Sequence, residues 1–549
     1  MIRWLLPLLA FCALAALPAL VSDYGLGLLI GAATYVTLAS AWALFSGHTR
    51  YISLATVAFY GTGAYTVAVL NEALPYPLVL VAAALIGAAL ALVVGLSTLR
   101  LAGVYFVIFT FGLAELIRQL ITWYEVNVTG TLGRYIFLDV TARGIYWQML
   151  ALGALTIGLT AWVQRARLGL ALRVIGDDET VAAHSGVDLA RTKLLAFTLS
   201  AVILTLAGAI VSPRWVYVEP SIVFNPTVSF LTVIMALLGG ASRLWGPALG
   251  AVPLFLVFEW LASSFPDTYP IFLGLVFIAT VSRCRKACWL ASSVFDPVMA
   301  GGDSESSRSG GSDDGLRRPA GGRRGDVCAR AGRDRRPDRP NGSGKTTPTE
   351  SDLRCPGARP PVGSSSTASC SSGRRLDSIA WMGVARTFQL VRTLPSLTLT
   401  ENVMVAAAFG AATSWGDAAR TVALRKLEVV GLVDRMAETA AELTHIDQKR
   451  LELARALAAE PSCAAVDEWL AGLNPTELDA GIELVRSLTR SASPFSSSTS
   501  RGRCRSRLFR LRVLVMNSAG SSPTMPTDVA LADPAVIAAY IGDDEDSGG

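Results

Sequence analysis

Residues 342–347 read Gly-Ser-Gly-Lys-Thr-Thr, a combination that can hold phosphate groups. In the pattern G-x-x-x-x-G-K-[ST], backbone N–H groups at a helix start surround the phosphates, while the lysine reaches the β- and γ-phosphates and the next hydroxyl binds Mg²⁺. Lys345 and Thr346 take these two positions, but Arg339 stands where the pattern has its first glycine. The candidate nucleotide-binding residues are Asn341, Gly342, Ser343, Gly344, Lys345, Thr346 and Thr347.

The segment before this loop does not read as the strand that should support it. Its residues, ARAGRDRRPD, lack the apolar run of a central parallel strand, so we expect no strand there. From 301 to 350, Leu316 and Val327 are the large apolar residues, and the segment is rich in arginine, glycine and serine. Such a composition cannot bury a core, and we expect 283–380 to be largely disordered.

Residues 1–282 are almost continuously apolar and account for much of the 52% hydrophobic content. Most of the apolar runs approach the ~20 residues that a helix needs to cross a membrane. We therefore predict a polytopic all-α membrane bundle of about ten helices. The runs are 4–22, 24–46, 51–70, 76–99, 103–123, 144–163, 194–213, 227–245, 248–265 and 270–282.

Basic residues indicate how this bundle is oriented. If Arg3 is cytoplasmic, the long polar loop 164–193 and the cluster around Arg283 also fall inside, although Arg134, Arg143 and Arg214 fall outside. The glycines of GTGAYT, residues 61–66, suggest a broken or re-entrant segment. We expect no distinctive charge at the middle of the membrane.

Several stretches of this half, among them FSGHTRYISLATVAFYGTGAYT and ALRVIGDDETVAAHSGVDLARTKLLAFTLSA, resemble the permease of branched-chain amino acid ABC importers. The resemblance covers nearly all of residues 25–280. It implies that the loop 164–193 carries the coupling helix that rests on the ATPase subunit, with Ala182, Ala183 and Gly186 matching its small residues. Thr180 stands where the family has an acidic residue.

Two later stretches, 383–407 and 443–479, resemble the ATPase subunit of the same importers. The resemblance implies that Gln389 is the Q-loop glutamine, Asp467 the Walker B aspartate that holds Mg²⁺, and Glu468 the catalytic glutamate. A metal-bound aspartate followed by a glutamate that polarises the attacking water suits phosphoryl transfer. Without that context, Asp467 and Glu468 could equally be a solvated surface pair.

The ATPase resemblance is incomplete. The signature glycine is missing, Trp469 replaces a proline, and SASPFSSSTSRGRCRSR stands where the switch histidine is expected. Recognisable and unrecognisable stretches alternate, as reading-frame shifts in a GC-rich gene would produce. We therefore expect this ATPase to be impaired.

These observations predict a permease fold at 1–282, a disordered basic linker at 283–335 and an incomplete α/β P-loop ATPase domain of ABC type at 336–549. The resemblance implies ATP-driven import of branched-chain or related hydrophobic amino acids or amides across the bacterial inner membrane, with the ATPase in the cytoplasm. It also implies ATP and Mg²⁺ as cofactors, and as partners a second permease, a second ATPase subunit and a substrate-binding protein. Two alternatives stay open: a permease whose ATPase is dead, and a membrane-anchored protein whose basic linker binds anionic lipid or nucleic acid.

Overall fold

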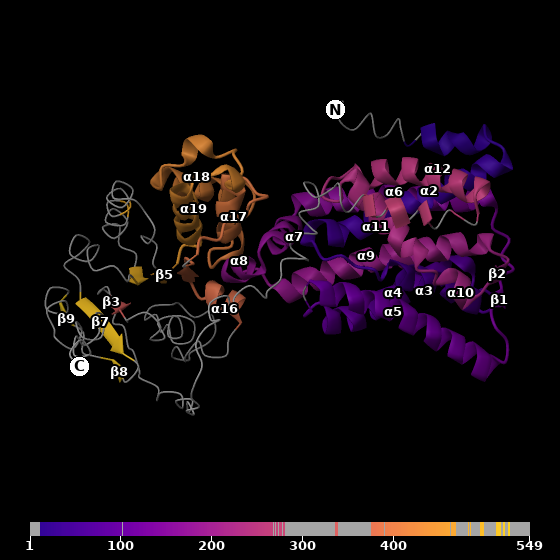
Figure 1. The fold of residues 1–549 in the computed structure, drawn as a ribbon, viewed down its shortest axis with the longest axis horizontal. Coiled ribbons are helices and arrows are strands. Elements are labelled where there is room, and N and C mark those ends of the chain that lie inside the picture. Colours follow the sequence, from indigo (N-terminus) through magenta and orange to yellow (C-terminus); the bar gives the residue numbers. More distant parts are fainter. Residues whose placement is uncertain are drawn as a thin grey trace, which may run out of the picture. The chain divides into compact units, whose positions relative to one another are not determined.

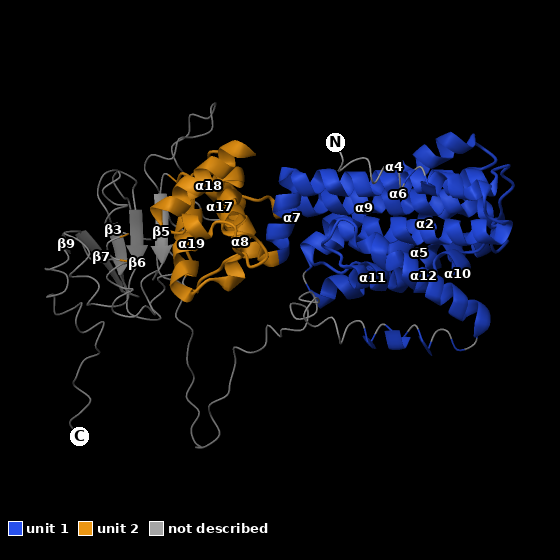
Figure 2. Cartoon of the chain, turned by 90° about the horizontal axis from the view of Figure 1, so that it is seen from above, with its two compact units in different colours: residues 1–176, 190–305 blue, residues 177–189, 306–549 orange. Residues whose placement is uncertain are grey.

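The computed structural model divides the chain into two compact units, residues 1–176 with 190–305 and residues 177–189 with 306–549 (Figure 2). The structure describes residues 11, 13–101, 103–266, 268, 271–272, 274–276, 278–279, 375–388, 390–461, 481 and 484, and the backbone of strands at 335–338, 463–467, 495–498, 512–517, 520–521 and 525–526.

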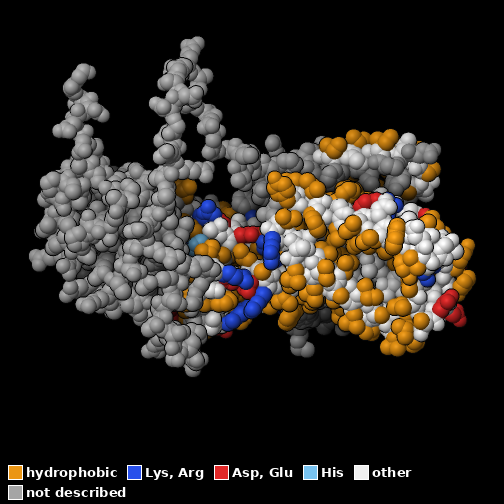
Figure 3. Space-filling view, turned by 90° about the horizontal axis from the view of Figure 1, so that it is seen from below, with side chains coloured by type: hydrophobic (Ala, Val, Ile, Leu, Met, Phe, Trp, Pro, Cys, Tyr) orange, Lys and Arg blue, Asp and Glu red, His pale blue; other side chains and the backbone are white. Residues whose placement is uncertain are grey.

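The first unit is a bundle of helices (Figure 1). Seven helical segments of its described part are long and apolar enough to cross a membrane. Figure 3 shows hydrophobic side chains over much of the visible face of these helices. The main helices are α2 (Asp23–Trp42), α3 (Thr56–Leu70), α4 (Tyr76–Thr98), α5 (Val104–Tyr124), α6 (Ala142–Arg165), α7 (Arg167–Asp177), α9 (Leu189–Val211), α10 (Pro220–Val223), α11 (Thr227–Gly239) and α12 (Gly246–Ser264).

The described helices match the central apolar runs of the sequence. Helix α3 is shorter than a full span, with 15 residues. Most of the first and last runs, 4–22 and 270–282, lies outside the described residues. The expectation of about ten spans therefore stays a prediction, while seven spanning candidates are present.

Small residues bring α3 and α9 into close contact. A Cβ at Gly63 of α3 would lie 1.8 Å from the carbonyl oxygen of Thr205, and one at Gly208 of α9 would lie 1.9 Å from that of Tyr60. Each glycine thus faces the backbone of the other helix, which is how membrane helices approach closely. Beside this contact, the rings of Phe59 and Phe197 meet edge to face at 5.6 Å.

The expected break at residues 61–66 is wrong, because these residues lie inside the continuous helix α3. The irregular backbone comes earlier, between the π-helical turn Ala43–Gly47 that extends α2 and the start of α3 at Thr56. Side chains hold this segment: the Trp42 indole donates to the Ser53 carbonyl (2.8 Å) and the Leu54 N–H donates to the Thr110 hydroxyl (3.1 Å). The two glycines serve close packing rather than a bend: Gly63 lies against α9, and Gly61 lies against the ring of Phe224, just after α10.

The second unit contains a helical subdomain built on α16 (Leu376–Trp381), α17 (Leu399–Phe409), α18 (Asp417–Val429) and α19 (His445–Ala458). Helix α17 begins with a capping box, in which Thr398 and Glu401 satisfy one another's backbone N–H groups. Leu399, Leu427 and Leu451 are fully buried where α17, α18 and α19 meet. The expectation that 283–380 is largely disordered falls mostly on residues outside the described ones and stays a prediction, while its last residues, 376–380, belong to α16.

Strands of the second unit form two separate ladders. Strand β5 (Cys463–Asp467) lies between β4 (Val384–Arg386) and β6 (Phe495–Ser498), and all three are parallel. Strand β3 (Arg335–Asp338) runs parallel to β7 (Arg512–Asn517), which pairs antiparallel with β8 (Gly520–Ser521) and β9 (Met525–Pro526).

Strand β3 corrects the expectation that no strand precedes the phosphate-binding loop. It ends at Asp338, shortly before Asn341. Its composition concealed it, since it reads Arg-Arg-Pro-Asp. Among the described strands it is hydrogen-bonded to β7 alone, and a strand paired on one side tolerates Pro337, whose missing N–H that pairing does not need.

Candidate functional site

Most of the expected nucleotide-site residues lie outside the described residues. These are Asn341, Gly342, Ser343, Gly344, Lys345, Thr346, Thr347, Gln389 and Glu468. The backbone of Asp467 is described and forms the last residue of β5. Of the sequence-predicted site, the coupling residues Ala182, Ala183 and Gly186 are fully described.

The strand arrangement nevertheless relates two of these positions. Arg386, the last residue of β4, pairs with Ala465 of β5, two residues before Asp467. Gln389 follows β4 by three residues along the chain. Because β4 and β5 are parallel, Asp467 lies at the carboxyl end of β5 and Gln389 comes shortly after the carboxyl end of the neighbouring strand in the chain; open α/β sheets bind ligands at such ends. The metal and Q-loop roles that the resemblance implies stay predictions.

The residues expected to form the coupling contact, Ala182, Ala183 and Gly186, lie on the short helix α8 (Glu179–His184) and the turn after it. Ala182 is completely buried and Ala183 is 7% exposed, so both pack within the second unit, which contains this loop together with α16 to α19. An acidic pair begins the helix, with Asp178 at the N-cap and Glu179 in the first turn. Thr180 stands where the family has an acidic residue, and the two residues directly before it, Asp178 and Glu179, are acidic.

Gly186 is the most constrained residue of this loop. Its φ is +93°, a conformation that favours glycine. A Cβ would also lie 2.1 Å from the carbonyl oxygen of Phe409, at the end of α17. The Gly186 carbonyl accepts a hydrogen bond from the Trp381 indole of α16 at 2.8 Å. Gly186 therefore contacts both α16 and α17.

Two carboxylates directly before α8 bind another segment of the second unit. Asp178 accepts hydrogen bonds from the N–H groups of Thr180 and Val181 and pairs with Arg392 at 3.0 Å. Asp177 accepts from the N–H and hydroxyl of Ser396. These contacts anchor the start of α8 to the segment 388–396, which contains Gln389.

The far end of the loop is held in the same way. Asp188 pairs with Arg375 at 2.8 Å, just before α16. The ring of His184 meets the ring of Phe388, directly before Gln389, edge to face at 5.0 Å. The segment 177–189, which we call the coupling loop after its expected role, is thus fixed at its two ends and at its middle.

Two buried residues of α19 hold the segment that follows β4. Glu452 accepts a hydrogen bond from the Phe388 N–H at 3.1 Å, and Arg455 donates to the Arg392 carbonyl at 2.7 Å. Their side chains are 1% and 6% exposed. Sequence reasoning missed both, because in LTHIDQKRLELARALAAE they look like ordinary charged residues of an amphipathic helix.

Burial changes the acidity of this cluster. Removal from water raises the pKa of the Glu452 carboxyl to about 7, against the opposing effect of Arg455 and of the hydrogen bond from Phe388. The contact between Glu452 and the segment that carries Gln389 therefore involves a group that titrates near neutral pH.

Comparison with known proteins agrees with both halves of the chain. Residues 25–281 match the family described as "Branched-chain amino acid transport system / permease component". Over 275 residues the chain is 28% identical to the high-affinity branched-chain amino acid transport system permease protein LivM of Salmonella typhimurium, covering 44% of this chain and 64% of LivM.

The second similarity is to an ATP-binding protein. Over 168 residues the chain is 35% identical to the high-affinity branched-chain amino acid transport ATP-binding protein LivG of Salmonella typhimurium, covering 27% of this chain and 63% of LivG. The chain thus spans less than two thirds of the length of each relative. One region of the chain thus resembles the permease, and a later region the ATP-binding protein, of branched-chain amino acid transport systems. The chain is a multi-pass membrane protein.

Solved structures add little to this. The ADP conformation of MJ1267, an ATP-binding cassette of an ABC transporter, is 20% identical, covers 39% of this chain and 89% of its own, and superposes with a TM-score of 0.31. At that level the likeness carries no argument about the site.

Proposed function

We propose that this chain is the permease, with an attached ATPase-like region, of an ATP-driven importer of branched-chain or related hydrophobic amino acids. The observation that carries the proposal is the coupling loop: residues 177–189 of the permease sequence pack in one compact unit with the ATPase-like helices. Gly186, Asp178 and Asp188 make the contacts that would pass a change in the ATPase to the helices α7 and α9 on either side of the loop.

The nucleotide would be ATP with Mg²⁺. Residues 341–347 would hold the phosphates, with Lys345 at the β- and γ-phosphates, and Thr346 and Asp467 would hold the metal. The bound Mg-ATP supplies the phosphoryl group whose hydrolysis drives transport. Glu468 would orient the attacking water, and Gln389 would link the site to the segment 388–396 that contacts the coupling loop. The parallel ladder that ends in Asp467 and the strand that ends before Asn341 support this assignment.

The same proposal implies an assembly in the bacterial inner membrane. A second permease would complete the path through the membrane, and a second ATPase subunit would complete the nucleotide sites. A substrate-binding protein outside would deliver the amino acid. The helical unit would span the membrane, with the loop 164–193 and the ATPase-like region in the cytoplasm.

Uptake by the reconstituted assembly tests the proposal. The full chain is placed in lipid vesicles with a second permease, a second ATPase and a binding protein of the same transporter class, with ATP on the cytoplasmic side. We expect ATP-dependent accumulation of radiolabelled leucine that falls when Gly186→Ala disturbs the coupling loop. Gly431→Ala, in the turn after α18 where an added Cβ meets nothing within 4 Å, should leave uptake unchanged. Absence of leucine uptake with all partners assembled would refute the function.

A further inference from the structure

Helix α5 carries a charged pair about half-way along its length. Glu115 and Arg118 lie one turn apart, and Glu115 Oε2 accepts from Arg118 Nε at 2.9 Å, with a second contact between Oε1 and Nη2. Gln119 donates to the same carboxylate at 2.9 Å. Three polar side chains are therefore gathered on one turn of a helix that is otherwise apolar enough to cross a membrane.

Aromatic residues towards the two ends of α5 indicate its depth in a membrane. Tyr105 and Trp123 are 75% and 60% exposed, and such residues gather at the membrane–water interfaces. At a rise of ~1.5 Å per residue they lie about 27 Å apart along the helix, close to the ~30 Å thickness of the hydrocarbon core. Glu115 lies about half-way between them. The expectation that the middle of the membrane lacks distinctive charge is therefore wrong for this helix.

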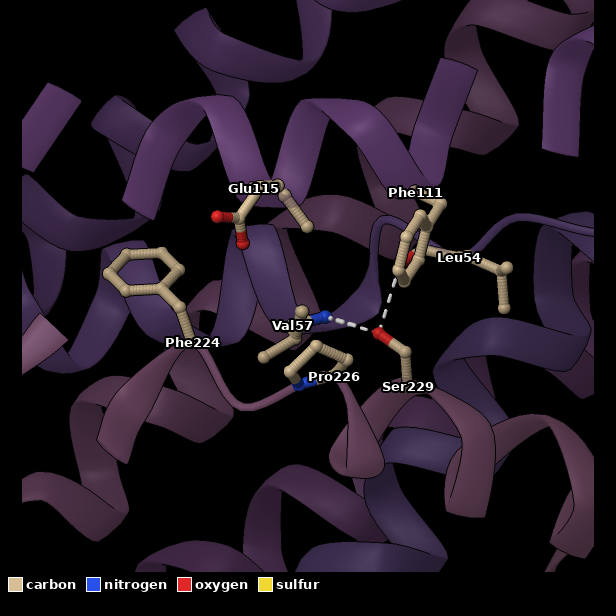
Figure 4. Close-up of a pocket in the computed structure, with 8 residues that line it drawn as sticks. Leu54, Val57, Phe111, Glu115, Phe224, Pro226 and Ser229 are labelled. Atoms are coloured by element: carbon tan, nitrogen blue, oxygen red, sulfur yellow. Dashed lines mark hydrogen bonds between the residues drawn. The ribbon is translucent and has the colours of Figure 1, made fainter. Parts of the chain in front are cut away.

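The pair is not covered by its own unit. The Glu115 side chain is 45% exposed and that of Arg118 is 28% exposed, and α5 has the lowest buried share among the spanning candidates of the described chain, 22% against 33% to 67%. The hollow that Glu115 lines with Val57 and Phe224 has room for about one water, so it cannot solvate the pair (Figure 4). Ionisable groups at this depth almost always face a water-filled cavity or another protein rather than lipid. The exposed face of α5 therefore needs a protein neighbour.

This face has the pattern of a helix–helix contact. Ile108, Gly112, Glu115 and Gln119 follow one another at intervals of four, three and four residues, which places them in one stripe along the helix, as in the seam between paired helices. Ile108 is 64% exposed, and a Cβ at Gly112 would meet nothing within 4 Å. In membranes, glycine at such a stripe lets two helix backbones approach closely, and amide side chains hydrogen-bond across the contact. We call these four residues the α5 seam.

We propose that the α5 seam binds the α5 seam of a second copy of this chain, so that two copies pair side by side in the membrane. Both copies have the same orientation in the membrane, so the two helices run parallel and like positions oppose one another about a two-fold axis. The inference rests on the proposed function in taking this neighbour to be the second permease that the function requires.

The seam is complementary to itself. The two Gly112 residues would allow a close approach, and the two Gln119 amides would bond to each other, because an amide both donates and accepts. The two Glu115 carboxylates would also approach, but each is already paired with Arg118 of its own helix, and a guanidinium has further N–H donors for the second carboxylate. The total charge of the contact is zero. Lipid or an apolar helix of another protein would offer these polar groups no partners, which is costly away from water.

Disulfide cross-linking of the full chain in membranes tests the pairing without ATP or transport. Two differently tagged copies, with the eight native cysteines replaced by serine, are expressed together and oxidised. Ile108→Cys places a thiol on the seam. Phe109→Cys, at the next residue and a position 43% exposed, places one about 100° further round the same helix. We expect a linked dimer that contains both tags for Ile108→Cys and none above background for Phe109→Cys.

Two glycines provide a matched pair of variants. Gly112→Leu fills the seam, whereas Gly158→Leu changes an exposed residue of α6; an added Cβ at either position meets nothing within 4 Å of its own chain. We expect Gly112→Leu to abolish the linking of Ile108→Cys and Gly158→Leu to leave it unchanged. Gln119→Leu should lower the linked fraction by about threefold, as the loss of an interhelical hydrogen bond of ~0.6 kcal/mol does.

Three results would overturn the pairing. The first is equal linking of Ile108→Cys and Phe109→Cys, which indicates random collision. The second is linking that is unchanged in both Gly112→Leu and Gln119→Leu. The third is the absence of a dimer with both tags, including the case in which Ile108→Cys links only to a separate permease supplied in the same membrane.

The outcomes also separate this pairing from the proposed function. Seam-specific linking without leucine uptake by the full assembly would refute the function and keep the pairing. Uptake by an assembly in which Ile108→Cys does not link two copies would refute the pairing and keep the function.

Discussion

Gly186 is the single residue at which the coupling loop should be most sensitive. An added methyl group would be strained at φ +93° and would meet the Phe409 carbonyl oxygen. The conformational cost alone is about 1–2 kcal/mol. We therefore expect Gly186→Ala to lower the thermal stability of the second unit.

Gly431→Ala provides the matched comparison, because Gly431 also has a positive φ, +73°, but has nothing within 4 Å of its added Cβ. We expect Gly186→Ala to be the more destabilising of the two in thermal unfolding of the full chain. Equal losses would show that the contact with Phe409 is unimportant.

The Glu452 carboxyl should make the stability of the second unit depend on pH. Its pKa rises from 4.5 to about 7 on folding, so the folded state holds the proton more strongly than the unfolded chain. This contribution to stability is complete below pH 4.5 and is lost as the pH rises through 7, amounting to at most about 3 kcal/mol.

Unfolding measured between pH 5 and pH 8 checks this. We expect Glu452→Gln, which keeps an acceptor for the Phe388 N–H, to flatten the decline in stability, and Glu442→Gln, at an exposed position, to leave it in place. A wild-type decline that persists in Glu452→Gln would assign it to another group.

Sequence reasoning selected residues whose type resembles a known motif and missed residues whose importance comes from burial. Ala182, Ala183 and Gly186 were selected because small residues in a polar loop match such a motif; the structure shows that they are closely packed, and their coupling role stays a prediction. Glu452 and Arg455 were missed because the sequence does not distinguish a charged residue that is buried in a core from one that faces water.

Among the elements, the six-residue helix α8 depends most on its cap. Asp178 satisfies two N–H groups of its first turn and pairs with Arg392. Asp178→Ala removes both contributions, and a lost N-cap costs about 1 kcal/mol. We expect faster hydrogen exchange of the backbone amides at 180–186.

Asp178→Asn separates the two contributions, since asparagine caps helices well but carries no charge for Arg392. We expect its exchange rates to lie close to those of the wild type. Exchange as fast as in Asp178→Ala would show that the ion pair, rather than the cap, holds the helix.

Helices and strands could be predicted from the sequence where their hydrophobic pattern was strong. Long apolar runs gave the spanning helices with nearly the observed bounds, as for α4 and α9. Strand β3 could not be found in the same way, because Arg-Arg-Pro-Asp becomes a strand through pairing with β7, more than 170 residues later in the chain. The break before α3 was misplaced because glycine marks both irregular backbone and close packing, and the neighbouring helix decides which applies.

At the scale of the whole molecule, the proposed orientation can be tested at two exposed positions, Thr131 in the loop before α6 and Ala190 near the start of α9. The exposed Thr131 precedes α6, and the exposed Ala190 follows the coupling loop after it. Because α6 crosses the membrane once in the proposed topology, we expect an impermeant thiol reagent outside intact cells to label Thr131→Cys. Ala190→Cys should react after the membrane is opened. Labelling of Ala190→Cys from outside would reverse the proposed orientation.

ATP turnover by the chain alone should be slow, although the structure has a strand, β3, before the phosphate-binding loop that was not expected from the sequence. Phosphoryl transfer depends on positioning and on groups that act together, and the sequence has Arg339 for the first glycine of the loop and lacks both the signature glycine and the switch histidine. Phosphate release is measured on the purified chain in lipid, beside Lys345→Ala and beside the chain supplied with a second ATPase subunit. We expect release by the chain alone to be close to that of Lys345→Ala. Rapid release that Lys345→Ala abolishes would show that the ATPase-like region forms a complete site despite these substitutions.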